Sequence, residues 1–183
     1  MKTSLLIIFQ LLTATFSFAH KSKWDENKSD WTVMMKYAYD NDTLNIDKLL
    51  KDTVDINEKN KRGWTALKVA VKKGNTNTVL YLLRHSANPN LGDNTGFTPL
   101  MEACQHNYYN IVKALLENKA NPNLKTSNDW TAIMSASSIA DIKILQLLIF
   151  YKADINAKSG DRTALTLANS EDKRKFLIKK GAK

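Results

Sequence analysis

The stretch Gly96-Phe97-Thr98-Pro99-Leu100 decides the fold of this chain because it recurs at a fixed distance. It returns upstream as Gly63-Trp64-Thr65-Ala66-Leu67 and, at the same spacing, downstream as Asp129-Trp130-Thr131-Ala132-Ile133. A further copy, Asp30-Trp31-Thr32-Val33-Met34, precedes the copy at Gly63 by the same number of residues. Self-similarity at a period of this length predicts a repeat architecture, and the other features of the chain belong within it.

Each copy continues into a short predicted helix that begins after its threonine. Thr65, Thr98 and Thr131 stand at the position of an N-cap, where a hydroxyl accepts a hydrogen bond from a backbone amide of the first turn. A break follows at residues that tolerate the left-handed backbone of a helix end, namely Asn41, Gly74 and Asn107.

A second predicted helix in each copy carries apolar residues three and four positions apart, which marks one buried face. Leu82 and Leu83 belong to one such stripe, and Leu115 and Leu116 to the next. Each copy ends in a turn with Asn or Asp, two residue types that bond their own backbone. These turns are Val54–Asn57, Ala87–Asn90, Ala120–Asn123 and Ala153–Asn156.

These features resemble the ankyrin repeat, whose pattern is Gly-x-Thr-Pro-Leu-His-x-Ala-Ala, then Gly, then Val-x-x-Leu-Leu, then Gly-Ala-x-x-Asn. The copy from Gly96 to Asn123 carries most of this pattern. The resemblance implies an all-α solenoid over residues 30–183, built from helix-turn-helix units at 30–62, 63–95, 96–128 and 129–161. Residues 162–183 are expected to form a shortened C-terminal capping repeat whose second helix has lost about three residues. The polar outer face of this cap is expected to hold Glu171, Asp172, Lys173, Arg174, Lys175, Lys179 and Lys180.

Departures from the family pattern predict weak points. The family's histidine is replaced in successive units by Met35, Lys68, Met101, Met134 and Thr166. This replacement puts the hydrogen bonds of that histidine to neighbouring turns in doubt. The glycine expected after the second helix is replaced by Thr53, Ser86, Lys119 and Lys152, which would bear some left-handed strain. The fourth unit has Ala140 where Gly or Asn is expected, so we expect an altered turn and the softest unit there.

Residues 1–19 have the layout of a signal peptide. Lys2 precedes an apolar run over residues 5–12, and Ser17-Phe18-Ala19 provides small residues for cleavage after Ala19. The alternative is an uncleaved membrane anchor, for which the apolar run is short. Residues 20–29 are expected to be a polar linker, and the mature chain to be periplasmic or secreted. It contains no second apolar segment long enough to cross a membrane.

The chain has a formal net charge of +9 and a single cysteine. Such a charge favours acidic proteins, anionic lipid or nucleic acid, although lysines spread along the chain also serve simply to solubilise a helical surface. Because Cys104 has no partner for an internal disulfide, packing alone must hold the fold. We interpret Cys104 as a small buried residue.

No catalytic constellation is present in the sequence. The chain lacks a Gly-rich phosphate loop, a His-Glu-x-x-His motif, a Cys pair and a Gly-x-Ser-x-Gly motif. His20, His85 and His106 are interpreted as solvated, since no cluster of them has metal-ligand spacing. Asp55 and Asp154 are interpreted as turn residues. The sequence therefore predicts no enzyme activity, no cofactor and no metal.

In the ankyrin fold, the residue before the threonine and the exposed side of the first helix line a concave face. At that position this chain has an aromatic ladder, Trp31, Trp64, Phe97 and Trp130, which ends in Arg162. Aromatic residues and arginine are frequent anchors of protein interfaces, so the ladder is a candidate binding surface. The alternative is that the aromatic rings serve the scaffold.

Charged and polar residues stand beside the ladder. The second unit contributes Lys61, Arg62, Lys72 and Lys73, and the third contributes Gln105 and His106. A groove that is basic at one end and neutral-polar at the other would suit a protein with an acidic, partly apolar segment. Four basic residues are a small footprint for nucleic acid, so nucleic acid is not expected as a partner.

The sequence thus predicts an exported, non-enzymatic ankyrin-repeat protein that binds a protein partner through its concave face. It favours a monomer but does not determine the oligomeric state. Resemblance to exported bacterial ankyrin proteins implies two subclasses. One is a periplasmic partner that supports a stress-defence enzyme, and the other is a secreted effector that acts on host proteins. A structural spacer and a hydrolase that uses the groove are weaker alternatives, since no motif favours the hydrolase.

Overall fold

The structure is a computed structural model that describes residues 30–183. The chain divides into two compact units, Met1–Trp31 and Thr32–Lys183. The predicted signal peptide (1–19) and linker (20–29) lie outside the described residues. The all-α prediction is confirmed: residues 30–183 contain helices and one isolated bridge between Ser159 and Arg162, with no named strand.

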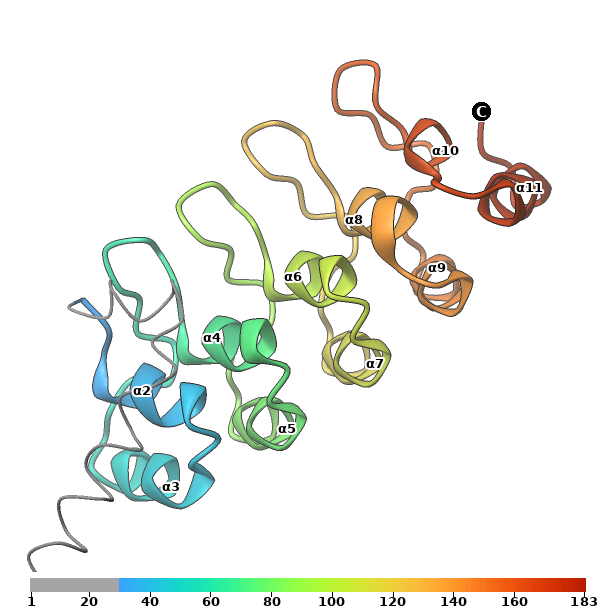
Figure 1. Ribbon diagram of the computed structural model, residues 1–183. Coiled ribbons are helices and arrows are strands. Elements are labelled where there is room, and N and C mark those ends of the chain that lie inside the picture. Colours follow the sequence, from blue (N-terminus) through green and yellow to red (C-terminus); the bar gives the residue numbers. More distant parts are fainter. Residues whose placement is uncertain (1–29) are drawn as a thin grey trace, which may run out of the picture. The chain divides into compact units, whose positions relative to one another are not determined.

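The helices come in pairs that repeat along the chain. The first helices of the pairs are α2 (Val33–Tyr39), α4 (Ala66–Lys73), α6 (Pro99–Gln105), α8 (Ala132–Ile139) and α10 (Ala164–Leu167). The second helices are α3 (Thr43–Lys51), α5 (Thr76–Arg84), α7 (Tyr109–Glu117), α9 (Ile142–Phe150) and α11 (Glu171–Lys179). Within Thr32–Lys183, the first helices stack on one another in one layer and the second helices form another layer (Figure 1). A finger-like loop precedes each first helix from α4 onward (Figure 1).

Threonine side chains cap most of the first helices, as predicted. The hydroxyl of Thr65 accepts a hydrogen bond from the amide of Lys68 at 3.2 Å, and that of Thr98 from the amide of Met101 at 3.3 Å. The prediction is wrong for Thr131, whose hydroxyl makes no cap bond and is buried without a partner among the described residues. Thr131 has the same extended backbone as Thr163, which does cap its helix.

The turns between paired helices follow the sequence prediction with one exception. Asn41, Gly74 and Asn107 all adopt positive φ, between 57° and 75°. Gly74 is also packed closely, because a Cβ there would lie 3.0 Å from the ring of Tyr108. Ala140 instead has an extended backbone with φ −72°. The turn of the fourth unit is therefore altered as expected, because an alanine disfavours the left-handed conformation.

The core repeats with the same period as the sequence. Leu67, Leu100 and Ile133 occupy equivalent positions of the first helices and are each 1% exposed. Leu82 and Leu115 do the same in the second helices, and each is completely buried. Burying one such side chain contributes about 2 kcal/mol. Cys104 lies in this core, as interpreted, and burial raises the pKa of its thiol.

Asparagines in the exit turns join each unit to the next. The Asn90 side chain accepts a hydrogen bond from the amide of Asn121 at 2.7 Å and donates one to the carbonyl of Lys119 at 3.1 Å. Asn123 makes the same two bonds with Asp154 and Lys152. The residues that replace the family's glycine, including Lys119 and Lys152, adopt positive φ of 63° to 69°, as predicted. The side chains of Asn90 and Asn123 thus bind the carbonyls of Lys119 and Lys152, two residues that have the left-handed backbone.

The C-terminal cap differs from the prediction in two ways. The shortened helix is the first one, α10, with four residues, whereas α11 has nine residues like the second helices of the other units. The chain breaks early because Ser170 begins α11 as its N-cap. Lys173 does not belong to the polar outer face, since it is only 6% exposed. Its ammonium group points into the array and donates to the side chain of Asn169 at 2.7 Å.

The fourth unit is expected to open more readily than the third. A missing N-cap bond costs about 1 kcal/mol, which corresponds to roughly five-fold faster local exchange. Amides at the start of α8 and in the turn at Ala140 should therefore exchange faster than their equivalents in α6 and at Asn107. Native-state hydrogen exchange measures this directly. Protection of the fourth unit that equals or exceeds that of the other units would contradict the expectation.

Candidate functional site

The fingers position the aromatic ladder by a repeated local hydrogen bond. In the fingers before α4, α6 and α8, one side-chain oxygen accepts the amide hydrogen of the aromatic residue four positions later. Asn60 accepts from Trp64 at 2.9 Å, Asp93 from Phe97 at 3.1 Å, and Thr126 from Trp130 at 3.1 Å. These bonds close each finger on itself and fix the direction in which its aromatic residue leaves the turn.

The residue before each aromatic adopts the left-handed backbone. Gly63 and Gly96 have φ of 75° and 82°, and Asp129 has φ of 58°. Only glycine fits at position 63, because a Cβ there would lie 2.5 Å from the side chain of Asn94 in the next finger. The fingers therefore approach one another closely at this point. The Asn94 amide group donates to the Lys61 carbonyl at 2.8 Å across this contact.

Three ladder residues lie within the unit Thr32–Lys183, and each is half-buried: Trp64, Phe97 and Trp130. The guanidinium of Arg62 lies 5.6 Å from the ring centre of Trp64, and the ammonium of Lys68 lies 4.8 Å from that of Phe97. Trp31 is also half-buried, but it is the last residue of the other unit, Met1–Trp31. We therefore restrict the candidate surface to Thr32–Lys183.

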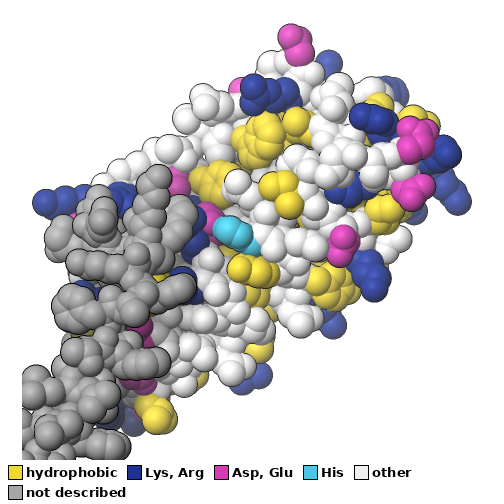
Figure 2. Space-filling model, viewed as in Figure 1, with side chains coloured by type: hydrophobic (Ala, Val, Ile, Leu, Met, Phe, Trp, Pro, Cys, Tyr) yellow, Lys and Arg dark blue, Asp and Glu magenta, His cyan; other side chains and the backbone are white. Residues whose placement is uncertain are grey.

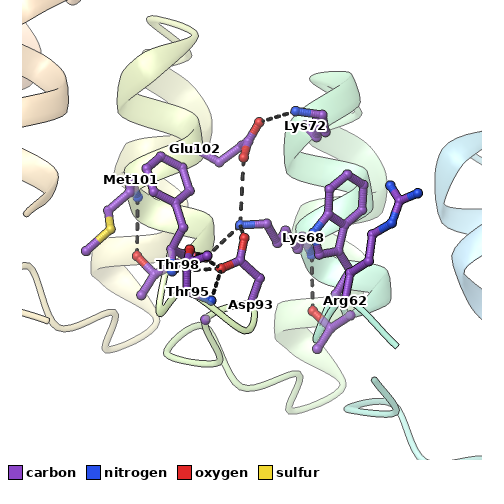
Figure 3. Close-up of polar contacts among 12 residues, drawn as sticks. Arg62, Lys68, Lys72, Asp93, Thr95, Thr98, Met101 and Glu102 are labelled. Atoms are coloured by element: carbon purple, nitrogen blue, oxygen red, sulfur yellow. Dashed lines mark hydrogen bonds and ion pairs between the residues drawn. The ribbon is translucent and has the colours of Figure 1, made fainter. Parts of the chain in front are cut away.

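Beside Phe97, a buried lysine bridges two carboxylates (Figure 3). Lys68 of α4 is 1% exposed, and its Nζ donates to the Phe97 carbonyl at 2.6 Å. The same Nζ lies 3.1 Å from a carboxylate oxygen of Asp93 and 3.7 Å from one of Glu102. Lys68 occupies the position of the family's histidine. The doubt about the hydrogen bond to the neighbouring turn is thus resolved for this unit, since lysine makes that bond.

Burial and the surrounding charges act on this network in opposite directions. Burial lowers the pKa of Lys68, and the nearby carboxylates of Glu102 and Asp93 only partly offset that effect. Burial by itself would raise the pKa of Asp93. Hydrogen bonds from Thr95 and the charge of Lys68 outweigh it, so the pKa of Asp93 lies below its ordinary value. The network therefore holds Asp93 ionised at neutral pH.

Two predicted site residues belong to the same network. Lys72 pairs with Glu102 at 2.8 Å, and the Nε2 of His106 lies 3.2 Å from the same carboxylate oxygen. The expectation of a freely basic end of the groove therefore needs correction at Lys72, whose charge is met within the fold. Sequence reasoning missed Asp93 and Glu102 as its counter-charges. The available signal was a lysine at a position that the resemblance makes buried, because a buried ammonium needs anionic neighbours.

The remaining basic residues of the predicted site lie at the surface or against rings. Lys61 is exposed at the tip of a finger, and Arg62 is half-buried beside Trp64. Lys73 is exposed, with its Nζ 4.1 Å from the ring centre of Tyr39. These three cations are not neutralised by a carboxylate in the part of the chain that the structure describes.

The C-terminal half of the face is built differently. A groove of about 430 Å³ runs over the third, fourth and fifth units, with Phe97 and Trp130 among its lining residues. The indole N–H of Trp130 donates to the Ser135 hydroxyl at 2.8 Å, which fixes the ring. Arg162 is exposed, with its guanidinium 5.9 Å from the ring centre of Trp130.

Several polar side chains that line this groove are uncommitted. Within residues 30–183, four of them make no hydrogen bond or ion pair: Gln105, Ser127, Asn128 and Arg162. The structure thus brings Phe97, Gln105, Trp130 and Arg162 of the predicted site together in one groove. Sequence analysis did not single out Ser135 or the half-exposed Ile139, which also line it.

Two profiles of known protein families match this chain, and both describe ankyrin repeats. The profile for ankyrin repeats in three copies matches residues 7–92 and 33–126, and that for a single ankyrin repeat matches residues 128–160. The chain belongs to the ankyrin-repeat family. Ankyrin repeats are generally protein–protein interaction modules and typically non-enzymatic. A comparison with curated proteins gave no match.

Among the residues that the structure describes, no group of three or more His, Cys, Asp and Glu side chains is placed to hold a metal ion. No helix in the same part of the chain is long and apolar enough to cross a membrane. Protein partners are the class of ligand that the family supports.

Replacing Lys68 by methionine tests the buried network. The Lys68→Met variant keeps the length of the side chain but leaves Asp93 and Glu102 without their shared cation, so we expect a loss of about 3 kcal/mol in unfolding free energy. Urea unfolding at pH 7 measures this loss. Lys61→Met is the matched control, and it should change stability by less than about 0.5 kcal/mol because Lys61 is exposed.

The pH dependence of the same pair of proteins gives an independent check. A depressed folded-state pKa for Asp93 contributes stability above the ordinary carboxyl pKa of about 3.9, and that stability is lost as the pH falls through the folded value. The gap between wild type and Lys68→Met should therefore shrink below about pH 4. A gap that is the same at pH 3 and pH 7 would show that Asp93 does not contribute.

Proposed function

We propose that this chain is an exported, non-enzymatic module that binds a protein partner on the concave face of its ankyrin array. The observation that carries the proposal is the groove beside Trp130. It combines a fixed aromatic ring with side chains that make no hydrogen bond or ion pair within residues 30–183. Interfaces are anchored by rigid aromatic residues and arginine, and uncommitted amide and hydroxyl groups can pair with a peptide backbone without first breaking internal bonds.

The two halves of the face have different tasks in this proposal. In the N-terminal half, Lys68 and Lys72 hold adjacent units together through Asp93 and Glu102. In the C-terminal half, Gln105 and Arg162 remain available. An acidic side chain of the partner would meet Arg162 at one end of the face, and Lys61 or Arg62 at the other. Charge then speeds the encounter, while the rings of Phe97 and Trp130 supply the buried contact.

Export rests on the signal-peptide pattern of residues 1–19. Two roles are compatible with it: a periplasmic partner of a stress-defence enzyme and a secreted effector. Fractionation of the producing cell distinguishes them, because retention in the periplasm excludes release. Recovery of the chain in the cytosol with residues 1–19 intact would contradict export altogether.

Substitutions in the groove test the binding proposal. With the expected mature chain (residues 20–183) as bait, Trp130→Ala should weaken binding of the captured partner by about 2 kcal/mol, or roughly thirty-fold. Arg162→Glu should weaken it by a similar factor if the partner segment is acidic. Trp130→Phe should retain most of the affinity, because it keeps an aromatic surface. Affinities are measured by titration calorimetry once the partner has been identified by mass spectrometry.

Two controls separate binding from folding. Arg84→Glu makes the same charge change as Arg162→Glu at an exposed position on the second-helix layer, and it should leave the affinity unchanged. Thermal unfolding of every variant verifies the fold. Lys72 is unsuitable for this test, because Lys72→Glu would place a second carboxylate against Glu102. Unaltered affinity in both Trp130→Ala and Arg162→Glu would overturn the concave-face proposal.

A further inference from the structure

The last residue of α9 is an exposed aromatic residue, whereas the second helices of the other units end in a charged residue. This residue, Phe150, is 74% exposed. In the register of the repeat, the equivalent residues of α3, α5, α7 and α11 are all charged: Lys51, Arg84, Glu117 and Lys179. The repeat itself thus provides the comparison, because the same solvent-facing position holds a charge in four units and an aromatic ring in one. A scaffold role does not account for Phe150.

Apolar and basic side chains surround this ring. A shallow groove of about 510 Å³ between α9 and α11 is lined by Phe150, Ile149 and Phe176, with Lys179 and Lys180 at the same site. Gln146 is the only uncharged polar residue of the lining. Within residues 30–183, the ammonium groups of Lys179 and Lys180 make no ion pair, although Lys180 lies 6.0 Å from the ring centre of Phe176. We call this set the α9–α11 patch.

Among the described residues, the excess of positive charge lies in the C-terminal part of the chain, which contains the α9–α11 patch. Residues 142–183 contain ten Lys and Arg against four Asp and Glu, whereas residues 30–141 contain thirteen against twelve. The lysines are spread along the chain as the sequence suggested, but the acidic residues that balance them are scarce at the C-terminal end. Figure 2 shows Lys and Arg side chains next to hydrophobic ones over the C-terminal elements.

We propose that the α9–α11 patch docks on an anionic lipid surface, with Phe150 at the level of the headgroups and Lys179 and Lys180 against lipid phosphates. An exposed aromatic ring flanked by lysines is the combination that binds such an interface, because apolar burial and charge attraction add. Gln146 is the only side chain of the patch that can both donate to and accept from a peptide backbone or a base edge, and a nucleic-acid phosphate backbone would leave the rings of Phe150 and Phe176 without an apolar partner. The chemistry therefore favours lipid over a second protein or a nucleic acid.

This placement is compatible with the concave-face function and does not depend on it. The patch lies on the second helices α9 and α11, whereas the groove beside Trp130 lies over the fingers and first helices. Docking through the second-helix layer would leave the groove open to a protein partner. Residues 30–183 would then be held at the membrane surface, although no helix among them is long and apolar enough to span it.

Vesicle binding of the full chain tests this proposal. Vesicles contain about one third phosphatidylglycerol, and control vesicles are phosphatidylcholine alone. We expect binding to the anionic vesicles only, with Phe150→Ser weakening it roughly five-fold and Lys179→Glu/Lys180→Glu roughly twenty-fold or more. Matched controls are Arg84→Ser at the equivalent helix end and Lys36→Glu/Lys48→Glu, which makes the same change in net charge. Neither control should weaken binding more than about two-fold.

A local reporter distinguishes the α9–α11 patch from other parts of the chain, including the apolar run over residues 5–12. An environment-sensitive dye is attached to the Phe150→Cys or Arg84→Cys variant, since Cys104 is buried and protected from labelling. The emission of the dye should shift to the blue on anionic vesicles for Phe150→Cys only. Equal shifts at both sites, equal binding to neutral vesicles, or equal loss in the control variants would overturn the proposal. A dimer in solution that Phe150→Ser converts to monomer would overturn it as well, because a second copy would then cover the patch.

Discussion

Each helix pair of this protein can bury its apolar stripe only against the next pair, and the rest of the structure depends on that stacking. Because the period of the repeat is constant, equivalent residues of neighbouring units stack on one another. Leu67, Leu100 and Ile133 therefore follow one another in one continuous core. At the exit turns, Asn90 and Asn123 turn the same stacking into hydrogen bonds between units. The fold is therefore a sum of neighbouring contacts, and each unit keeps its own character.

That independence explains why the two halves of the concave face differ. Lys68 directs its charge into the array, where Asp93 and Glu102 neutralise it and the Phe97 carbonyl accepts a hydrogen bond from it. The equivalent residues Met101 and Met134 are apolar and make no such demand on their neighbours. The side chains of the groove residues Gln105 and Arg162 make no hydrogen bond or ion pair within the described chain. The buried ion pairs of the concave face thus lie in its N-terminal half, and the groove side chains without a hydrogen bond or ion pair lie in its C-terminal half.

Sequence reasoning predicted correctly the features that depend on a residue and its near neighbours in the chain. Thr65 and Thr98 cap their helices, and Gly74 and Asn107 take the left-handed turn, because these preferences are local. It failed where a side chain chooses among distant partners. Lys173 was placed on the outer face from its charge alone, yet it turns inward and its ammonium group donates to the carbonyl of Ser137 in α8 at 3.4 Å. The shortened helix of the cap was assigned to α11 instead of α10, since the shortening of a repeat does not say which helix loses residues.

By itself, the sequence determined the repeat, the family, the helix pairs and the positions of the ladder residues, because all of these follow from periodicity and local backbone preference. Only the tertiary structure decided which charges are free. Residues separated by about one period, such as Lys68 and Glu102, come within ion-pair distance only when two units stack. The same stacking sets Phe150 beside Phe176 and Lys180. Long-range electrostatics and surface patches depend on which side chains meet across units, and a one-dimensional pattern does not contain that information.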